Sequence, residues 1–156
     1  FSIFKNVKFR LILELKRSKM SKTIAVKHGT YKNYDYMVLN AHGTHFCAYV
    51  RLPESHPFYK LPYDAIDLDC HDGLTFGEMT DFENVRLRVW DPGYGLWWIP
   101  GRWVEEKVKK GYWIGWDYYH KGDFCPAFPE RGGREWTADE IVLEAKMVIE
   151  ELIKKE

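Results

Sequence analysis

The C-terminal end of the chain places the strongest constraint on the fold, because it has the pattern of one amphipathic helix. Apolar residues recur there at helical spacing and share one face, namely Ile141, Ala145, Val148 and Leu152. Thr137, followed three residues later by Glu140, has the pattern of a capping box at a helix start. We therefore predict a helix over residues 137–154 whose apolar face is covered by the rest of the domain.

Short segments with the two-residue period of a β-strand precede this helix. Apolar and polar side chains alternate within residues 45–52, 64–71, 84–90 and 112–117. Residues 102–110 carry apolar side chains amid charges and end at Gly111, which is typical of a short surface helix. Strands followed by a long helix indicate the α+β class. We predict a mostly antiparallel sheet of about five or six strands, with the C-terminal helix packed on it and one short helix.

The length of the chain, 156 residues, fits one domain. We assign residues 20–156 to a single α+β domain that begins at Met20. Residues 1–19 are interpreted as an N-terminal extension or arm, or as a segment that is not native. The competing interpretation is an edge strand, because residues 3–15 are rich in β-forming side chains.

Charge and cysteine content bear on the partners and the compartment. Lys and Arg together number 23, as do Asp and Glu, so no net field would recruit nucleic acid or an anionic membrane. No apolar run is long enough for a transmembrane helix. Cys47, Cys70 and Cys125 form no CxxC pair, and free thiols fit a reducing cytosol. We expect a cytoplasmic protein.

A polar stretch over residues 64–78 draws attention as a candidate site. If residues 64–71 form a strand, Asp67, Asp69 and His71 share one face, and the apolar Ile66 and Leu68 share the other. Carboxylates and an imidazole are costly to bury without partners, so this face meets water or lines a site. A glycine-marked turn follows, with Thr75 just beyond it.

A second polar stretch lies in residues 113–126 and offers Asp117, His120 and Asp123 among aromatic residues. We predict that the two stretches meet. Rings beside carboxylates and imidazoles suit a ligand that stacks and donates hydrogen bonds, such as a nucleobase or ribose. The predicted ligand-binding residues are Asp69, His71, Thr75, Trp113, Asp117, His120 and Asp123.

The sequence assigns no cofactor, but the same side chains include ligand types for a divalent metal. Asp69, His71, His120 and Asp123 are ligand types for Mg²⁺, Mn²⁺ or Zn²⁺, and a bound ion could activate water for hydrolysis of a phosphoester or amide. Their spacing matches no established metal motif such as HExxH. The simpler interpretation is that the groups hydrogen-bond one another and the backbone, and hold loops near the end of the sheet.

Tryptophans in a glycine- and proline-rich segment favour a protein contact. Trp97 and Trp98 lie in the predicted loop 91–101, and Arg102 and Trp103 follow directly. Tryptophan and arginine are enriched among the residues that dominate binding energy at protein interfaces. The alternative is a loop folded back over an open sheet edge.

The two polar stretches together resemble a family of small proteins encoded by phages and prophages, without an established activity. That family carries a "DVHGGLTY" segment, a "WWIGFDCAHAGD" segment and a C-terminal helix. The matching residues are Asp69, His71, Gly73, Leu74 and Thr75 in the first segment, and Trp113, Ile114, Gly115, Asp117, His120, Gly122 and Asp123 in the second. The resemblance covers residues 36–78 and 112–152. Asp72 stands where the family has glycine, and residues 81–110 look like an insertion.

The resemblance implies a viral origin and an accessory role during infection. We therefore expect a protein that acts by binding in the host cytosol and antagonises a host defence or regulatory system. It would sequester a small, nucleotide-like ligand or cap a host protein. The alternative is a metal-dependent hydrolase that uses the Asp/His cluster. The residues alone do not select binding over turnover.

Overall fold

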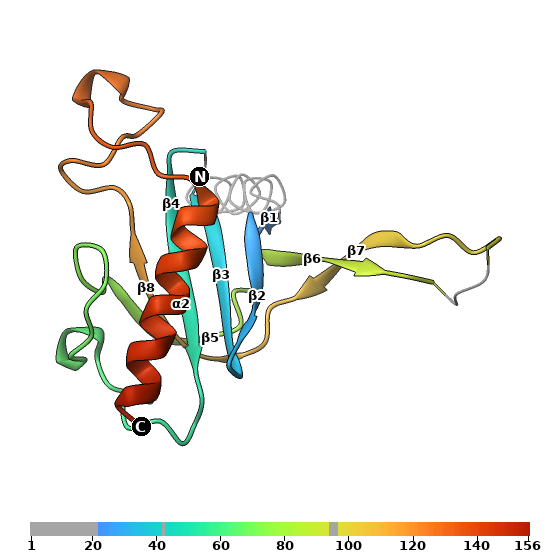
Figure 1. Ribbon diagram of the computed structural model, residues 1–156, viewed down its shortest axis with the longest axis horizontal. Helices are drawn as coiled ribbons and strands as arrows, with labels where there is room; N and C mark the ends of the chain where they lie inside the picture. The colour runs from blue at the N-terminus through green and yellow to red at the C-terminus, as the bar shows by residue number, and fades with distance from the viewer. Residues whose placement is uncertain (1–21, 42, 94–96) are drawn as a thin grey trace, which may run out of the picture.

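The computed structural model describes residues 22–41, 43–93 and 97–156. The elements, shown in Figure 1, are β1 (Thr23–Ile24), β2 (Lys27–Tyr31), β3 (Tyr34–Ala41), β4 (His45–Leu52), η1 (Tyr63–Ala65), β5 (Phe76–Thr80), β6 (Val85–Asp91), β7 (Arg102–Lys107), β8 (Gly111–Asp117), η2 (Pro129–Arg131) and α2 (Ala138–Lys154). The interpretation of residues 1–19 as an arm or an edge strand lies outside the described residues.

The strands form two sheets. The larger has the order β2-β3-β4-β8-β5 and is antiparallel throughout. The smaller has the order β1-β6-β7, with β1 parallel and β7 antiparallel to β6. The α+β class and the long C-terminal helix are therefore confirmed. Across the part of the chain described, no helix combines the length and the apolar character needed to cross a membrane.

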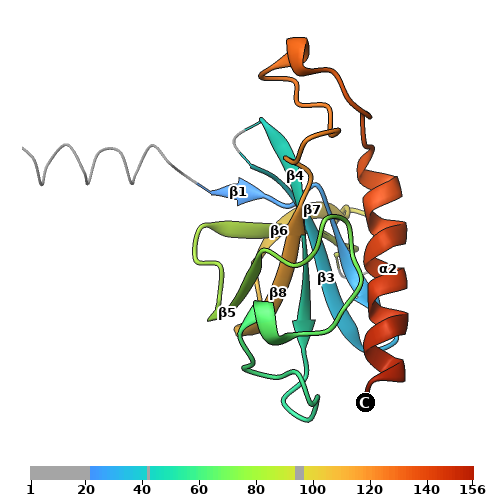
Figure 2. The same ribbon diagram turned by 90° about the vertical axis from the view of Figure 1, so that its left-hand side faces the viewer.

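The main core lies between α2 and one face of the five-stranded sheet, as Figure 2 shows. The predicted capping box is present at the start of the helix: the Glu140 amide donates to the Thr137 hydroxyl, and the Glu140 carboxylate accepts from the Thr137 amide. The residues that α2 buries are Ile141, Ala145, Val148, Ile149 and Leu152. The apolar stripe that the sequence predicts is thus the face that packs on the sheet.

The opposite face of the sheet carries a second apolar cluster. It contains Met37, Trp113 and Val108, together with Val85 at the start of β6. Because neighbouring residues in a strand point to opposite faces, Trp113 joins this cluster, whereas Trp116 of the same strand joins the main core. The sheet therefore separates two cores.

Residues 64–71 are not a strand, which corrects the prediction. The alternation itself is present, since Ile66 and Leu68 are buried and Asp67 and Asp69 are exposed. The segment after η1 runs extended beside α2, and side chains of the helix region bind its backbone. Lys155 Nζ donates to the Asp67 carbonyl at 2.7 Å, and the His71 amide donates to Glu144 Oε1 at 2.8 Å.

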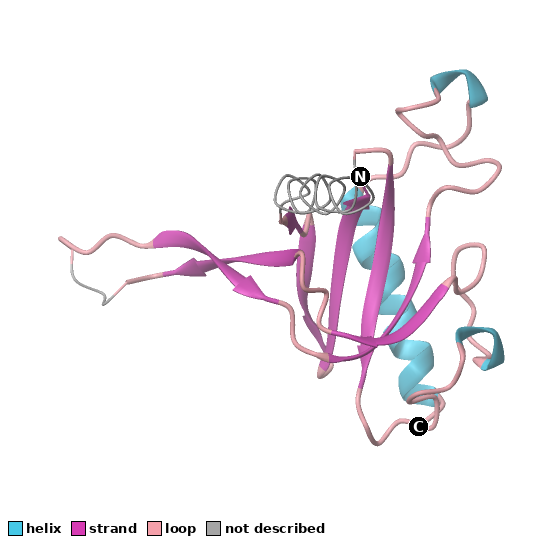
Figure 3. Ribbon diagram, turned by 180° about the vertical axis from the view of Figure 1, so that it is seen from behind, coloured by secondary structure: helices cyan, strands magenta, loops and turns pink. Residues whose placement is uncertain are grey.

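Residues 102–110 do not form the predicted short helix. Residues 102–107 are strand β7, paired antiparallel with β6, and the short helical turns η1 and η2 lie elsewhere. The β6–β7 hairpin extends away from the body of the molecule, as Figures 1 and 3 show. The segment 81–110, which resembled an insertion, thus includes a projecting arm.

We expect the α2–sheet interface to carry a large part of the folding stability. Ile149→Ala should lower the free energy of unfolding by roughly 2–5 kcal/mol, because it leaves a cavity in a fully buried site. Leu143→Ala is the matched control on the same helix, where the side chain is 62% exposed, and should change stability by less than about 0.5 kcal/mol. Urea unfolding of both variants checks the difference. Equal losses would contradict this packing.

Candidate metal centre

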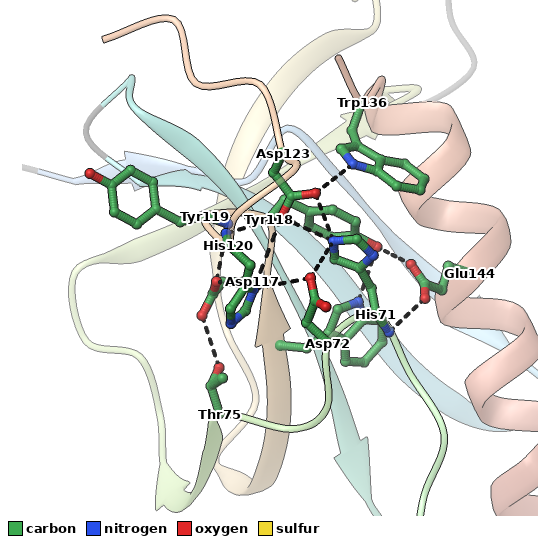
Figure 4. Close-up of polar contacts among 11 residues, drawn as sticks. His71, Asp72, Thr75, Asp117, Tyr118, Tyr119, His120, Asp123, Trp136 and Glu144 are labelled. Carbon is green, nitrogen blue, oxygen red and sulfur yellow. Dashed lines mark hydrogen bonds and ion pairs between the residues drawn. The ribbon is translucent and has the colours of Figure 1, made fainter. Parts of the chain in front are cut away.

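Two loops bring imidazoles and carboxylates together beside the N-terminal half of α2, as Figure 4 shows. His71 and Asp72 lie in the turn that follows the extended segment. Asp117 ends β8, and His120 and Asp123 lie in the loop directly after it. The two polar stretches therefore lie together in the structure, as the sequence predicted.

Each loop has a local reason for its shape. Asp72 and Gly73 both have positive φ, at 53° and 82°, and the Gly73 amide donates to the Cys70 carbonyl. Aspartate and glycine tolerate this left-handed conformation better than most residues. In the second loop the Asp123 amide donates to the His120 carbonyl, which closes a turn that puts both side chains on one side.

Four ligand atoms, one from each of His71, Asp72, His120 and Asp123, all lie within 4.8 Å of one another. His71 Nε2 is 3.1 Å from Asp72 Oδ2 and 2.8 Å from Asp123 Oδ1. His120 Nδ1 is 3.4 Å from Asp72 Oδ2 and 3.9 Å from Asp123 Oδ2. Ligands about 2.1 Å from a tetrahedral zinc ion stand roughly 3.4 Å apart. The observed separations bracket that value.

Asp123 anchors the cluster. Its carboxylate is 5% exposed and accepts hydrogen bonds from Trp136 Nε1 at 2.9 Å and from the His120 amide at 3.0 Å, and it lies beside His71 Nε2. Burial raises the pKa of the Asp123 carboxyl, but the hydrogen bonds from His71, His120 and Trp136 outweigh burial and hold it below its ordinary value. Asp123 is therefore an ionised carboxylate at neutral pH.

His120 Nδ1 is the least satisfied atom of the cluster. It is buried and has no hydrogen-bond partner, although Asp117 Oδ1 lies 3.3 Å away and the carboxylates of Asp72 and Asp123 lie within 4.0 Å. Asp117 is itself fixed, because it accepts from the Thr75 hydroxyl and from the Tyr119 amide. Three carboxylates around one unpartnered imidazole nitrogen form an arrangement that a cation would stabilise.

Aromatic rings and Glu144 support the cluster from the side of the main core. The Tyr118 ring stacks on the His71 imidazole at 4.5 Å, and Trp136 meets the same imidazole edge-on at 4.9 Å. Glu144 of α2 accepts from the His71 amide and from the Tyr118 hydroxyl. Burial, followed by the hydrogen bond to Glu144, raises the pKa of Tyr118, so its hydroxyl stays protonated. These contacts hold His71 in one orientation.

The cluster is open to water on one side. Asp72 and His120 have exposed side-chain fractions of 45% and 34%, whereas those of His71 and Asp123 are 18% and 4%. A bound ion would therefore be held from the protein side by His71 and Asp123. The buried His120 Nδ1 would face the ion from within the cluster, and Asp72, the most exposed of the four, would border the side that water reaches.

The structure brings together five of the seven predicted site residues: His71, Thr75, Asp117, His120 and Asp123. It does not bring in Trp113, which is 2% exposed on the opposite face of the sheet and donates to the Lys109 carbonyl. Asp69 is also outside the group of four possible ligands. It lines a depression that adjoins the cluster, shares His71 and Glu144 with it and continues to Met147 and Glu151 of α2.

Sequence reasoning missed three contributors: Asp72 as a possible ligand, and Trp136 and Glu144 as supports. Asp72 follows His71 directly, and a turn places both side chains on the same site, whereas a strand would have separated them. Its signal was the Asp-Gly pair, which is typical of a turn. Nothing in the local sequence indicates that Glu144, on the helix, reaches the His71 amide.

The cysteines do not supply a nucleophile. Cys47, Cys70 and Cys125 are all free, as predicted. Burial raises the pKa of the Cys70 thiol to about 12 and that of Cys47 to about 11, so neither forms the reactive thiolate at neutral pH. Cys125 Sγ donates to the Thr44 carbonyl at 2.9 Å. The chemistry of this region therefore rests on the imidazoles and carboxylates.

Comparisons of this chain with protein-family models, with curated proteins and with solved structures find no match. The resemblance to phage and prophage proteins therefore stays a prediction.

Proposed function

We propose that the protein is a divalent-metal-dependent hydrolase with its centre at His71, Asp72, His120 and Asp123. The observation that supports this proposal most is His120 Nδ1, a buried nitrogen without a hydrogen-bond partner that faces three carboxylates. Hydrogen bonding alone accounts for His71 and Asp123, but it leaves this nitrogen unpartnered. A metal ion would bind the nitrogen and the carboxylates at once.

The donor set indicates which metals fit. Two imidazole nitrogens favour Zn²⁺, Mn²⁺ or Fe²⁺ over Mg²⁺ and Ca²⁺, which prefer oxygen ligands throughout. Two carboxylates, from Asp72 and Asp123, would balance the charge of a divalent ion. Trp136 and the His120 amide hold Asp123 from behind, as residues around metal ligands commonly do.

A metal bound there would lower the pKa of a coordinated water and generate a nucleophile near neutral pH. The residues of the chain would set up that chemistry. His71 is fixed by Tyr118 and Glu144, so its Nε2 points at the centre. Asp117, held by Thr75, lies beside His120 and is placed to accept a proton. Phosphoesters and amides are the substrate classes that suit such a centre.

Metal binding should be visible as stabilisation. Protein freed of metal with EDTA should gain melting temperature when Zn²⁺ or Mn²⁺ is added. A hundredfold excess over Kd adds about 2.7 kcal/mol to the free energy of unfolding, which corresponds to roughly 5–10 °C for a chain of this size. His120→Ala should abolish the shift. His28→Ala is the matched control, because that imidazole binds the Arg88 carbonyl outside the cluster, and it should keep the shift.

Turnover is tested with bis(p-nitrophenyl) phosphate and with a p-nitroanilide amide. Hydrolysis of either substrate should require the metal and should fall at least a hundredfold in Asp123→Asn and in His120→Ala. Circular dichroism of each variant shows whether the fold is intact. Metal ions that leave the melting temperature unchanged, or hydrolysis that persists in EDTA, would contradict the proposal.

A second candidate function is the capture of a nucleotide-like ligand without turnover. A recess of about 190 Å³ adjoins the cluster and shares Tyr118 and Trp136 with it. Phe46 and Phe124 also line the recess, as does Asn40, whose buried Oδ1 has no hydrogen-bond partner among the residues that the structure describes. A planar base that donates an N–H to Asn40 and packs against these rings would fit its chemistry.

Adenosine and guanosine monophosphates are the probes for this recess. With EDTA present, one of them at millimolar concentration should raise the melting temperature by at least about 2 °C, and Asn40→Ala should remove the shift. Asn84→Ala, a change at an exposed asparagine, is the control. An equal shift with ribose 5-phosphate, or no shift with either nucleotide, would count against base recognition.

The wider role is a proposal that rests on the sequence resemblance alone. An accessory protein of viral type could use either activity against a host system, by destroying a small signal or by sequestering it. The predicted alternative is that the protein caps a host protein. The exposed tryptophans of the β6–β7 hairpin are the residues that would make this contact.

A further inference from the structure

The β6–β7 hairpin carries a concentration of exposed aromatic surface. Trp90, Trp97, Trp98 and Trp103 lie on this arm and have exposed fractions of 52–89%. Tryptophan side chains are seldom left in water without a partner, and grouped apolar exposure of this kind marks contact surfaces. The arm projects from the body, so these rings are accessible from outside the domain (Figures 1 and 3).

The register of the hairpin divides its side chains between two faces. One face carries Leu87, Val89 and Val104, and Leu87 packs against the second core. The other face carries three successive cross-strand pairs: Arg86 with Lys107, Arg88 with Glu105, and Trp90 with Trp103. We name these six residues the outer face of the arm. The cations lie toward the root of the arm, and the two rings follow them toward its tip.

The outer face has a surplus of positive charge. Its one carboxylate, Glu105, lies 3.6 Å from Lys22 and is balanced by it. Among the described residues, no carboxylate lies within ion-pair distance of Arg86, Arg88 or Lys107. The charge that is balanced over the whole chain is thus unevenly distributed: the arm presents three cations without an ion pair among the described residues, of which Arg86 donates to the carbonyls of Glu83 and Val85.

A groove continues this surface toward the body. It measures about 610 Å³ and is lined by Lys27 and His28 on one side and by Arg88 and Trp103 on the other. The guanidinium of Arg88 lies 5.4 Å from the centre of the Trp103 ring. The Trp90 and Trp103 rings meet edge to face at 5.3 Å, and the two residues stay 52% and 58% exposed.

We infer that the outer face of the arm binds single-stranded nucleic acid. Proteins that bind such strands without sequence preference combine a cationic track for the phosphates with exposed aromatic rings on which bases stack. Arg86, Arg88 and Lys107 supply the first element, and Trp90 and Trp103 supply the second. The inference concerns a different surface from the metal centre and does not depend on it.

The test uses the full chain and a fluorescein-labelled oligothymidylate of twenty nucleotides, with EDTA present so that any metal-dependent cleavage is silent. Anisotropy and tryptophan quenching should both report binding at low salt. Three phosphate contacts predict a slope of about −2 for log K against log salt. Arg88→Ala should reduce that slope by about 0.7, and Trp90→Ala/Trp103→Ala should weaken binding at least tenfold.

The tip of the arm provides the matched control. Trp97→Ala/Trp98→Ala also removes two exposed rings but leaves the outer face intact, and it should change Kd less than twofold. Equal losses in the two double variants would overturn the inference, as would the absence of any anisotropy change. Polyglutamate that competes as well as the oligonucleotide would overturn it in favour of an acidic protein partner. Polyphosphate that competes equally well would show charge attraction without stacking.

Discussion

The buried carboxylate of Asp123 is the interaction on which the arrangement of the candidate site depends. A charge at this depth is costly unless several donors satisfy it, and its donors come from three segments: His71 before β5, the His120 amide after β8, and Trp136 before α2. Meeting that requirement draws the three segments together. The loop between β8 and α2 must fold back on the site, and Trp136 then stands directly ahead of the Thr137 cap. The position of the helix and the geometry of the cluster are therefore coupled through one side chain.

Sequence patterns predicted best the element whose own residues specify where it begins and which face it buries. The capping box at Thr137 and the apolar stripe of α2 specify a start and a buried face, and both are confirmed.

For residues 64–71, the sequence pattern predicted the buried side chains but not the secondary structure. Alternation indicates which side chains are buried, but it does not indicate whether a neighbouring strand supplies hydrogen bonds to the backbone. Here Glu144 and Lys155 bind the backbone instead. For residues 102–110, apolar side chains amid charges and a closing Gly111 favoured a helix, but residues 102–107 pair with β6 as a strand.

The candidate site was predictable in its location and only partly in its membership. His71, His120 and Asp123 follow from residue type and from the expectation that two polar stretches meet. Trp113 could not be separated from Trp116 by sequence, because which of them faces the second core depends on the register of β8 in the sheet. Asp72 was absent from the predicted metal ligands, because those of the first polar stretch were taken from the polar face of the expected strand, and Asp72 belongs to the turn expected after it. In the structure, a left-handed turn at Asp72 points its side chain and that of His71 to the same site. The residue types indicate a turn there, but they do not specify its φ and ψ angles.

The five-stranded sheet also separates the two surfaces that we propose to be functional. The metal cluster is supported by Tyr118, which belongs to the main core on the α2 side, whereas the root of the arm packs through Val85 and Leu87 on the second core. Among the described residues, no hydrogen bond or ion pair joins the cluster to the hairpin. Free energies of substitution add when residues share no partners and fail to add when they belong to one network. A change at Arg88 combined with one at His120 should therefore show no coupling, whereas His71 and Asp123, whose side chains share a hydrogen bond, should couple strongly. This separation makes it possible to assign an activity to one surface without disturbing the other.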